Sequence, residues 1–548
     1  MVRSVRPIAV AGLALLLVAC TGGMAPTGAP ITAPDQHPLP TRPPFNSVPT
    51  ARPWNPVPTA APWDAPTDAP SAAATDGPPW NPVPLPQPVP TVAPPPGNQF
   101  EDAGVNPFVD PVTDPFSTFA MDVDTASYSV ARRFLEDGYI PERDSVRLEE
   151  YVNSLDYGYQ PPTDGAFAVH VEGAPSPFVG SRSILLRVGI QAREIADASR
   201  PSVSLTFVID TSGSMAMENR LELVKQSLAL LTSRLRPDDS IAIVAFGGGA
   251  QVVLTPTSAA EPAAILNAIN GLQTNGSTNA QAGLELGYDI ALLGHRPGAL
   301  DRVVFASDGV ANAGLTDADS ILARIDREVS AGVELVTIGV GMGNFNDVLL
   351  EQLADRGNGF YAYVNDRREA DEVFGSELVG TLISIARDAK VQVEFRSDSV
   401  LRYRLLGYEN RRVADDDFRD PTVDAGEIGA GHTVTALYEI EPNWSGSGFI
   451  GTVRLRWLDP ATGAEQEALQ DIDAADVRGD YYSASPAFRL AATVAGFAEI
   501  LRQSPYVSGY NLRDVAAEAS VLTGVLVGQA DVIEFSQLAQ MAARMSGL

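Results

Sequence analysis

Between residues 201 and 388, short apolar runs alternate with longer segments of helical periodicity, and this order of elements constrains the fold more than any other feature of the chain. The clearest run, Val203–Ile209, is almost continuously apolar, as expected of a parallel strand that is covered on both faces. Alternating strands and helices predict a doubly wound, Rossmann-like α/β sheet. The turn signal Gly247-Gly248-Gly249 adds one antiparallel strand to it.

Periodicity and β-branched composition give the expected elements of this unit. The strands are expected at Val203–Ile209, Ile241–Phe246, Gln251–Leu254, Arg302–Ala306, Glu334–Val340 and Gly359–Val364. The helices are expected at Arg220–Leu235, Ala263–Leu272, Ala280–Leu293, Asp319–Ala331, Asp347–Asp355 and Arg368–Arg387.

Both flanks of the α/β unit are rich in expected strands. The N-terminal flank has strands at Phe116–Val123, Phe167–Val171 and Ile184–Ile190, and helices at Ser127–Leu135 and Val146–Leu155. The C-terminal flank has strands at Lys390–Phe395, Tyr403–Leu406, Thr433–Ile440 and Gly451–Trp457, followed by helices at Phe488–Leu501 and Val532–Met545. We therefore hypothesise one β-sandwich that is interrupted by the inserted α/β domain.

The chain begins with a short basic and apolar segment that ends in its single cysteine, so no intramolecular disulfide is possible. Arg3 and Arg6 precede the apolar run Ile8–Ala19, which is too short for a comfortable transmembrane helix. Leu17-Val18-Ala19-Cys20 resembles the bacterial lipobox. The resemblance implies a lipoprotein acylated at Cys20, palmitate included, in the cell envelope and facing the periplasm or the exterior. A plain signal peptide with a chance cysteine is the alternative.

Residues 20–100 are expected to be a disordered linker. More than half of the 43 prolines of the chain precede residue 100, and Pro-Trp-Asn-Pro-Val-Pro occurs at 53–58 and again at 79–84. Such a segment buries no core and favours extended polyproline II, which makes it a semi-rigid tether. The repeated Trp could instead be a ligand motif for another protein.

The formal net charge of −30 restricts the class of partner. Nucleic-acid binding needs Lys and Arg to displace counterions from phosphates, so we exclude nucleic acid. The four histidines lie far apart in sequence, which excludes an HExxH zinc site, and no Lys-Ser/Thr follows the glycine turn as a nucleotide phosphate loop requires.

A run of oxygen-bearing side chains follows the first strand of the α/β unit: Asp210, Ser212 and Ser214. Ligands bind at the carboxyl ends of the strands in such sheets, and alternate residues of a tight loop can direct several oxygens to one point. Thr278, just before an expected helix, and Asp308, just after an expected strand, lie at corresponding places. Carboxylate and hydroxyl oxygens suit Mg²⁺ or Mn²⁺ better than Zn²⁺ or Cu²⁺.

This pattern of five residues resembles the metal-ion-dependent adhesion site of von Willebrand factor type A (VWA) domains. The resemblance implies that Ser212, Ser214 and Thr278 ligate Mg²⁺ (or Mn²⁺ or Ca²⁺) directly or nearly so. It implies that Asp210 and Asp308 act largely through water and that an acidic residue of a partner protein completes the coordination. The alternative is that Asp210 and Ser212 cap the helix beginning near Glu218.

Other acidic residues allow two readings. Asp122 and Asp124 could bind a second cation, although a cap by Asp124 or Thr125 on the following helix is favoured. Asp415-Asp416-Asp417 could hold Ca²⁺, although no EF-hand-type loop surrounds the run and a solvated acidic loop is favoured.

The flanks carry a narrower resemblance, to the YfbK-type bacterial lipoproteins. It rests on Asp122–Tyr128, Arg132–Leu135, Val146–Asn153, Tyr403–Arg411 and Asp424–Tyr438, and it covers about residues 105–548.

These readings give six segments and one leading function. The segments are a signal peptide (1–19), the lipid-anchored linker (20–100), an N-terminal α+β region (101–200), the VWA domain (201–388), a β-rich region (389–480) and a helical region (481–548). We expect a non-enzymatic envelope lipoprotein that binds a protein partner through its metal site. An assembly or chaperone-like component of an envelope complex is the alternative, and a metal-dependent hydrolase is a weaker rival.

Overall fold

The computed structural model describes the globular part of the chain, residues 100, 102–121, 124–178, 183–308, 323, 332–341, 347–364, 367–371, 373–374, 383–420, 423, 425–443 and 448–547. The expected signal peptide, Cys20 and nearly all of the proline-rich linker lie outside the described residues. So do Asp122, Asp424, Leu548 and, except for Ala323, the expected helix Asp319–Ala331.

The α/β unit contains a six-stranded sheet. Its strands are β4 (Val203–Asp210), β5 (Ser240–Phe246), β6 (Ala250–Ser258), β7 (Leu300–Ser307), β8 (Glu334–Val340) and β9 (Tyr361–Val364). They lie in the order β6-β5-β4-β7-β8-β9, and only β6 is antiparallel to its neighbour. The predicted doubly wound sheet with one antiparallel strand is therefore confirmed, and its five parallel strands, β5, β4, β7, β8 and β9, end at the same edge.

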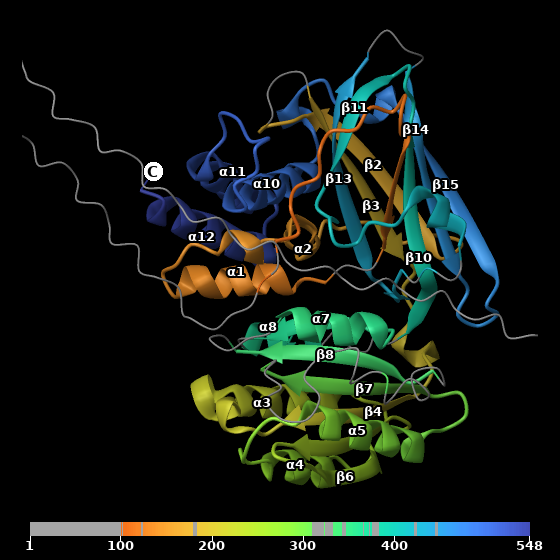
Figure 1. The fold of residues 1–548 in the computed structure, drawn as a ribbon, viewed down its shortest axis with the longest axis vertical. Coiled ribbons are helices and arrows are strands. Elements are labelled where there is room, and N and C mark those ends of the chain that lie inside the picture. Colours follow the sequence, from red (N-terminus) through yellow and green to blue (C-terminus); the bar gives the residue numbers. More distant parts are fainter. Residues whose placement is uncertain are drawn as a thin grey trace, which may run out of the picture. The chain divides into compact units, whose positions relative to one another are not determined.

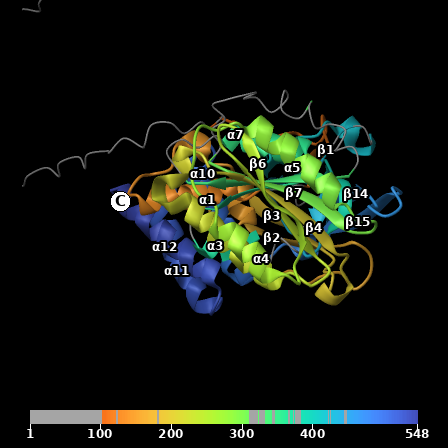
Figure 2. The same ribbon diagram turned by 90° about the horizontal axis from the view of Figure 1, so that it is seen from below.

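Helices cover both faces of this sheet. They are α3 (Arg220–Arg234), α4 (Pro262–Asn270), α5 (Ala280–Gly294), α7 (Asp347–Arg356) and α8 (Arg367–Asp371). Buried side chains of α5 and α7 share one core with the sheet, whereas those of α3, α4 and α8 share the core on the other face. Figure 2 shows α5 and α7 on one side of the strands and α3 and α4 on the other.

The long helix expected over Arg368–Arg387 is wrong at its C-terminal end. α8 ends at Asp371, and Ser384 begins the strand β10 (Ser384–Phe395). The physical reason is tertiary: Ser384 and Ala386 pair with a neighbouring strand, and this pairing outweighs the helical periodicity of the local sequence.

The two flanks together build a β-sandwich (Figure 1). One sheet contains β1 (Phe116–Ala120), β10, β14 (Phe449–Leu458) and β15 (Glu465–Asp473), with β12 (Ile428–Gly429) beside β10; the other contains β11 (Val400–Leu406), β13 (Thr433–Pro442), β3 (Ile184–Ala192) and β2 (Phe167–Pro175). β1 pairs with β10 and β3 pairs with β13, so strands from before and after the α/β unit share both sheets. The hypothesis of one interrupted sandwich is confirmed.

Helices from both flanks pack on the outer face of the second sheet. α2 (Leu148–Asn153), α10 (Pro486–Leu501), α11 (Leu512–Val525) and α12 (Ala530–Met545) share a buried core with Leu185, Leu406 and Leu437 of the sandwich. α2 is shorter than the expected Val146–Leu155, and β15 and α11 were not singled out from the sequence. No helix among the described residues has the length and apolarity needed to cross a bilayer.

One flanking helix belongs to the core of the α/β unit. α1 (Ala126–Glu136) buries Val130 and Phe134 in the same cluster as α5, α7 and Tyr361 of β9. The α/β unit and its flanks are therefore joined by packing as well as by the chain.

The segment 428–432 holds both connections between the α/β unit and the sandwich. At the entry, the Ala192 amide donates to the carbonyl of His432 at 2.9 Å. At the exit, the Ala430 amide donates to the carbonyl of Ile383 at 2.9 Å, and β12 pairs with the start of β10. The inserted domain thus leaves the sandwich close to where it enters.

Candidate metal-binding site

Three of the predicted site residues lie in the loop that follows β4. Asp210 is fully buried; its Oδ1 accepts from the Ser212 amide at 2.7 Å and its Oδ2 from the Ser307 hydroxyl at 2.7 Å. The hydroxyl oxygens of Ser212 and Ser214 are 3.0 Å apart. One carboxylate and two hydroxyls therefore gather at the carboxyl edge of the central strand.

Thr278 is brought to the same edge by a second loop. The Gly213 amide donates to the carbonyl of Gly276 at 3.1 Å, and the Asn279 amide donates to the carbonyl of Gly247 at 2.8 Å. A Cβ on Gly247 would lie 2.3 Å from the carbonyl oxygen of Asn275, so this approach requires glycine. Thr278 is only 1% exposed and lies between these two bonded positions.

Asp308 follows the neighbouring strand β7 and is also fully buried. Its Oδ2 accepts from Arg220 Nη1 at 3.0 Å, whereas its Oδ1 is buried without a hydrogen-bond partner. A buried carboxylate oxygen without a partner is costly, which makes this atom suited to a cation or to a water held by one.

The surroundings of Asp210 affect its ionisation. Burial and the negative charge of Asp308 together raise the pKa of Asp210 to about 6, although the hydrogen bonds from Ser212 and Ser307 act in the opposite direction. Adjacent buried carboxylates disfavour full ionisation unless positive charge lies nearby.

The chemistry of these residues fits a hard divalent cation. Two carboxylates and three hydroxyls are oxygen donors of the kind that Mg²⁺ and Ca²⁺ prefer. Within the described part of the chain, no three His, Cys, Asp or Glu side chains are grouped to hold a metal. A metal at this edge would therefore depend on the serine and threonine hydroxyls.

The capping alternative fails on geometry. Ser212 precedes a 3-10 helix at Gly213–Asn219 without a side-chain cap bond, and Asn219 likewise does not cap α3. The cap of α5 is Asn279, whose Oδ1 accepts from the Ala282 amide at 3.1 Å, so it is not Thr278.

Comparison with known proteins places this geometry in a family. The chain is 35% identical over 451 residues to YfbK of Escherichia coli strain K12, which covers 78% of this chain and 77% of that protein. The family described as "Uncharacterized protein YfbK, C-terminal" matches residues 380–450 and 444–544.

The chain belongs to the YfbK family.

Within this YfbK-family chain, the von Willebrand factor type A domain family matches residues 205–310, which include all five predicted site residues, and a von Willebrand factor family matches residues 95–186. The α/β unit is thus a VWA domain, a class associated with protein–protein interaction and adhesion. Protein sll0103 of Synechocystis sp. is 30% identical over 189 residues, 34% of this chain and 44% of that protein. The solved von Willebrand factor type A structure from Catenulispora acidiphila is 21% identical, covering 62% of this chain and 81% of that one, with a TM-score of 0.38.

Sequence reasoning missed two residues that hydrogen-bond to the predicted site residues of this YfbK-family protein. Ser307 binds Asp210, and Arg220 binds Asp308 from the first position of α3. Ser307 could have been found from the sequence, because a hydroxyl-bearing residue directly before Asp308 lies at the same strand end. Nothing in the periodicity of α3 marks Arg220, because its partner lies 88 residues away.

The expected helix cap near Asp124 is wrong. The Asp124 carboxylate instead accepts from the Tyr361 amide at 3.1 Å and from Arg411 Nη2 at 2.5 Å, and Thr125 makes no side-chain cap bond. Charge-assisted hydrogen bonding to a buried arginine stabilises a buried carboxylate strongly. Asp124 thus ties α1 to β9 and to the C-terminal flank.

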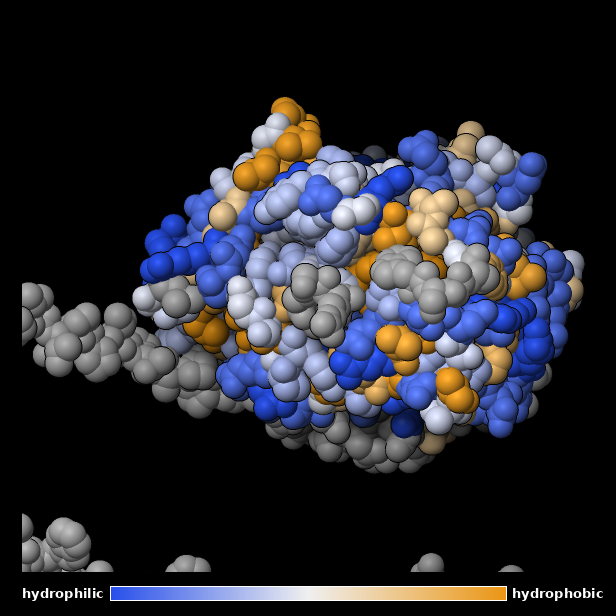
Figure 3. Space-filling view, turned by 90° about the horizontal axis from the view of Figure 1, so that it is seen from above, coloured by the Kyte–Doolittle hydropathy of each residue, from blue (hydrophilic) through white to orange (hydrophobic). Residues whose placement is uncertain are grey.

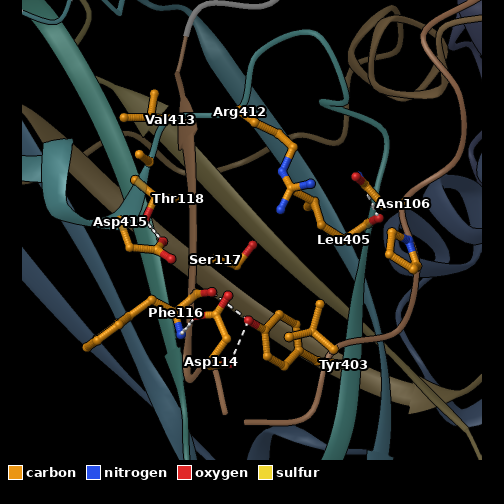
Figure 4. Close-up of a pocket in the computed structure, with 13 residues that line it drawn as sticks. Asn106, Asp114, Phe116, Ser117, Thr118, Tyr403, Leu405, Arg412, Val413 and Asp415 are labelled. Carbon is orange, nitrogen blue, oxygen red and sulfur yellow. Dashed lines mark hydrogen bonds between the residues drawn. The ribbon is translucent and has the colours of Figure 1, made fainter.

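The acidic run at Asp415 borders a cavity of about 230 Å³ in the sandwich (Figure 4). The run forms a 3-10 helix, Asp415–Arg419, rather than the expected loop. Asp415 accepts from Thr118 Oγ1 at 2.5 Å, and the Tyr403 hydroxyl donates to the carbonyl of Asp114 at 3.0 Å. These bonds hold the walls of the cavity together, on elements that contain none of the five predicted site residues.

Proposed function

We propose that this YfbK-family protein binds a protein partner through a divalent cation held at the carboxyl edge of its VWA sheet. The observation that carries the proposal is the convergence of Asp210, Asp308 and the paired hydroxyls of Ser212 and Ser214 at that edge, with Asp308 Oδ1 left without a partner. A hard divalent cation, Mg²⁺, Mn²⁺ or Ca²⁺, is proposed because every donor is an oxygen.

Each residue has a distinct role in this proposal. Ser212, Ser214 and Thr278 offer hydroxyl oxygens as ligands, whereas Asp210 and Asp308 supply negative charge and hold water. The bound cation would supply an electrophilic centre, and an acidic side chain of a partner would complete its coordination. Binding rather than catalysis is proposed, since hydrolysis needs a general base in addition to the metal, and this proposal uses both carboxylates at the edge to hold the cation.

The N-terminal segment supports a place for this binding. We propose that Cys20 carries the lipid anchor, and that the proline-rich linker holds the VWA domain away from the membrane in the cell envelope. A chain with −30 net charge resists close contact with an anionic bilayer, which favours such a spacer.

A metal titration of the purified full chain tests the proposal. We expect Mg²⁺ and Mn²⁺ to raise the thermal unfolding midpoint of the wild type and to leave Asp210→Ala unchanged, because ligand binding stabilises only the state that holds the site. Asp301→Ala is the matched control: Asp301 is a buried carboxylate on the same strand, β7, but at its opposite end. An Asp301→Ala protein that loses the metal response, or a wild type that never shows one, would contradict the proposed site.

A further inference from the structure

Arg220 lies beside the proposed metal site, although it belongs to none of the loops that form it. It is the first residue of α3, it is 3% exposed, and its Nη1 donates to Asp308 Oδ2 at 3.0 Å. A buried guanidinium is stable only with such a partner, so the fold places a permanent positive charge at this edge.

The surrounding backbone is shaped to admit this side chain. Glu218 and Asn219, directly before Arg220, both have left-handed backbone angles (φ 50° and 59°), which turn the chain sharply into α3. At the end of β8, Gly341 has φ +81°, and a Cβ there would lie 2.0 Å from Arg220 Nε. The turn at Glu218 and Asn219 and the end of β8 at Gly341 therefore both leave room for the Arg220 side chain.

The charges of the buried groups determine which ionic ligands are attracted to this edge of the VWA sheet. Asp210 and Asp308 together with Arg220 carry one net negative charge. A divalent cation changes this to one net positive charge, and one carboxylate from outside then restores neutrality. Without Arg220 the loaded site would already be neutral, and an acidic ligand would gain little from Coulombic attraction.

Glu218 does not alter this balance. It approaches Arg220 at 3.9 Å, but its side chain is 46% exposed and it also pairs with Arg133 of α1 at 3.2 Å. Solvent screens an exposed pair of this kind, whereas it does not reach the buried charges.

We propose that Arg220 is the specificity-determining residue of the site: its fixed positive charge weakens cation binding but makes the loaded site select a carboxylate ligand. The inference rests on the proposed metal site and adds to it the origin of the preference for an acidic partner. Arg220 acts through charge and through Asp308, and it does not itself contact the partner.

The test uses Mn²⁺ as the metal and acetate as the carboxylate probe on the full chain. Free Mn²⁺ is measured by electron paramagnetic resonance, and acetate binding by the loss of water-proton relaxation at bound Mn²⁺. In Arg220→Gln we expect Mn²⁺ to bind about tenfold more tightly and acetate about tenfold more weakly, the size of change that a charge of this kind produces at a partly buried site. Arg220→Lys, which keeps the charge, should resemble the wild type in both measurements.

Arg302→Gln is the matched control, since Arg302 is a buried, ion-paired arginine near the start of β7, at the other end of the sheet. It should leave both affinities unchanged. Opposite shifts in Arg220→Gln cannot arise from a general loss of structure, which would weaken both. The inference is overturned if folded Arg220→Gln binds Mn²⁺ and acetate with unchanged affinity, or binds both more weakly. It is also overturned if Arg220→Lys loses acetate binding, and this second variant provides the test if Arg220→Gln does not fold. A wild type that fails to bind Mn²⁺ would instead refute the metal site itself.

Discussion

At the scale of the residue, a buried ionisable side chain can make the stability of the protein depend on pH, and Glu149 of α2 is an example. It is 2% exposed, and its Oε2 has no hydrogen-bond partner. Burial, with added repulsion from Glu409 and Glu150, raises the pKa of Glu149 to about 7. The folded protein therefore holds the proton of this carboxyl more tightly than the unfolded chain does.

This difference predicts a stability that declines as the pH rises. The contribution of Glu149 is present below its ordinary pKa and is lost as the pH rises through about 7. Urea unfolding at pH 5 and at pH 8 should show Glu149→Gln losing less free energy of unfolding across this range than the wild type, by about 2–3 kcal/mol. Identical pH dependence in the two proteins would show that Glu149 does not titrate in this window.

The residues of the candidate site differ in how far sequence could predict them. Asp210, Ser212 and Ser214 follow an apolar strand in a recognisable spacing, and the structure places them together as predicted. Arg220 could not be found, because an ion pair between distant residues leaves no periodic signal. The role of Asp124 was misjudged for the same reason, since Arg411 lies 287 residues further along the chain.

At the scale of the element, the α11–α12 hairpin presents an uncharged, apolar tip. Val525 and Val527 are exposed, whereas Leu522 one turn earlier is fully buried. Figure 3 shows an apolar projection at the upper edge of an otherwise largely hydrophilic face, where this tip lies. We therefore expect the burial of each side chain at this tip, rather than its hydrophobicity, to determine how much it contributes to the free energy of unfolding.

This contrast gives a paired prediction for α11 and the turn that follows it. Leu522→Ala should lower the free energy of unfolding by about 2–5 kcal/mol, because it leaves a cavity in the helical core. Val527→Thr should change it by less than about 0.5 kcal/mol, because the side chain packs against little. Chemical denaturation of both variants checks the pair, and a large loss in Val527→Thr would mean that the tip is covered in solution.

Elements with strong periodicity were predictable, while short or paired ones were not. The inner strands of the VWA sheet, such as β4 and β5, were recognised because they are buried on both faces and are therefore almost continuously apolar. The start of β10 was misread as helix, since its strand character depends on β12. β15 has mostly exposed side chains and therefore lacks the apolar alternation that marks a strand.

At the scale of the whole molecule, the sandwich depends on both flanks. β1, β2 and β3 come from before the VWA domain, and β3 lies inside its sheet between β13 and β2. Sequence patterns suggested this arrangement but could not establish it, because periodicity does not pair strands.

A fragment of residues 384–548 should therefore not fold cooperatively by itself. Without β3, the inner strand β13 would expose an unpaired edge, and the core side chains that pack against β3 would face water. We expect poor near-ultraviolet circular dichroism and no cooperative melting. Addition of a second fragment, residues 100–200, should restore both if the flanks recognise each other; cooperative unfolding of the isolated fragment would contradict the expectation.

The two connections between the VWA domain and the sandwich lie close together at residues 428–432, and this determines how the protein responds to a pulling force. A partner pulling on the VWA domain loads both connections at once, and they continue into β3 and β10. Each of these is an interior strand of a different sheet, bonded to a neighbour on both sides. Force along such a strand must shear two hydrogen-bonded ladders together rather than peel an edge. The insertion therefore divides a mechanical load between the two sheets of the sandwich.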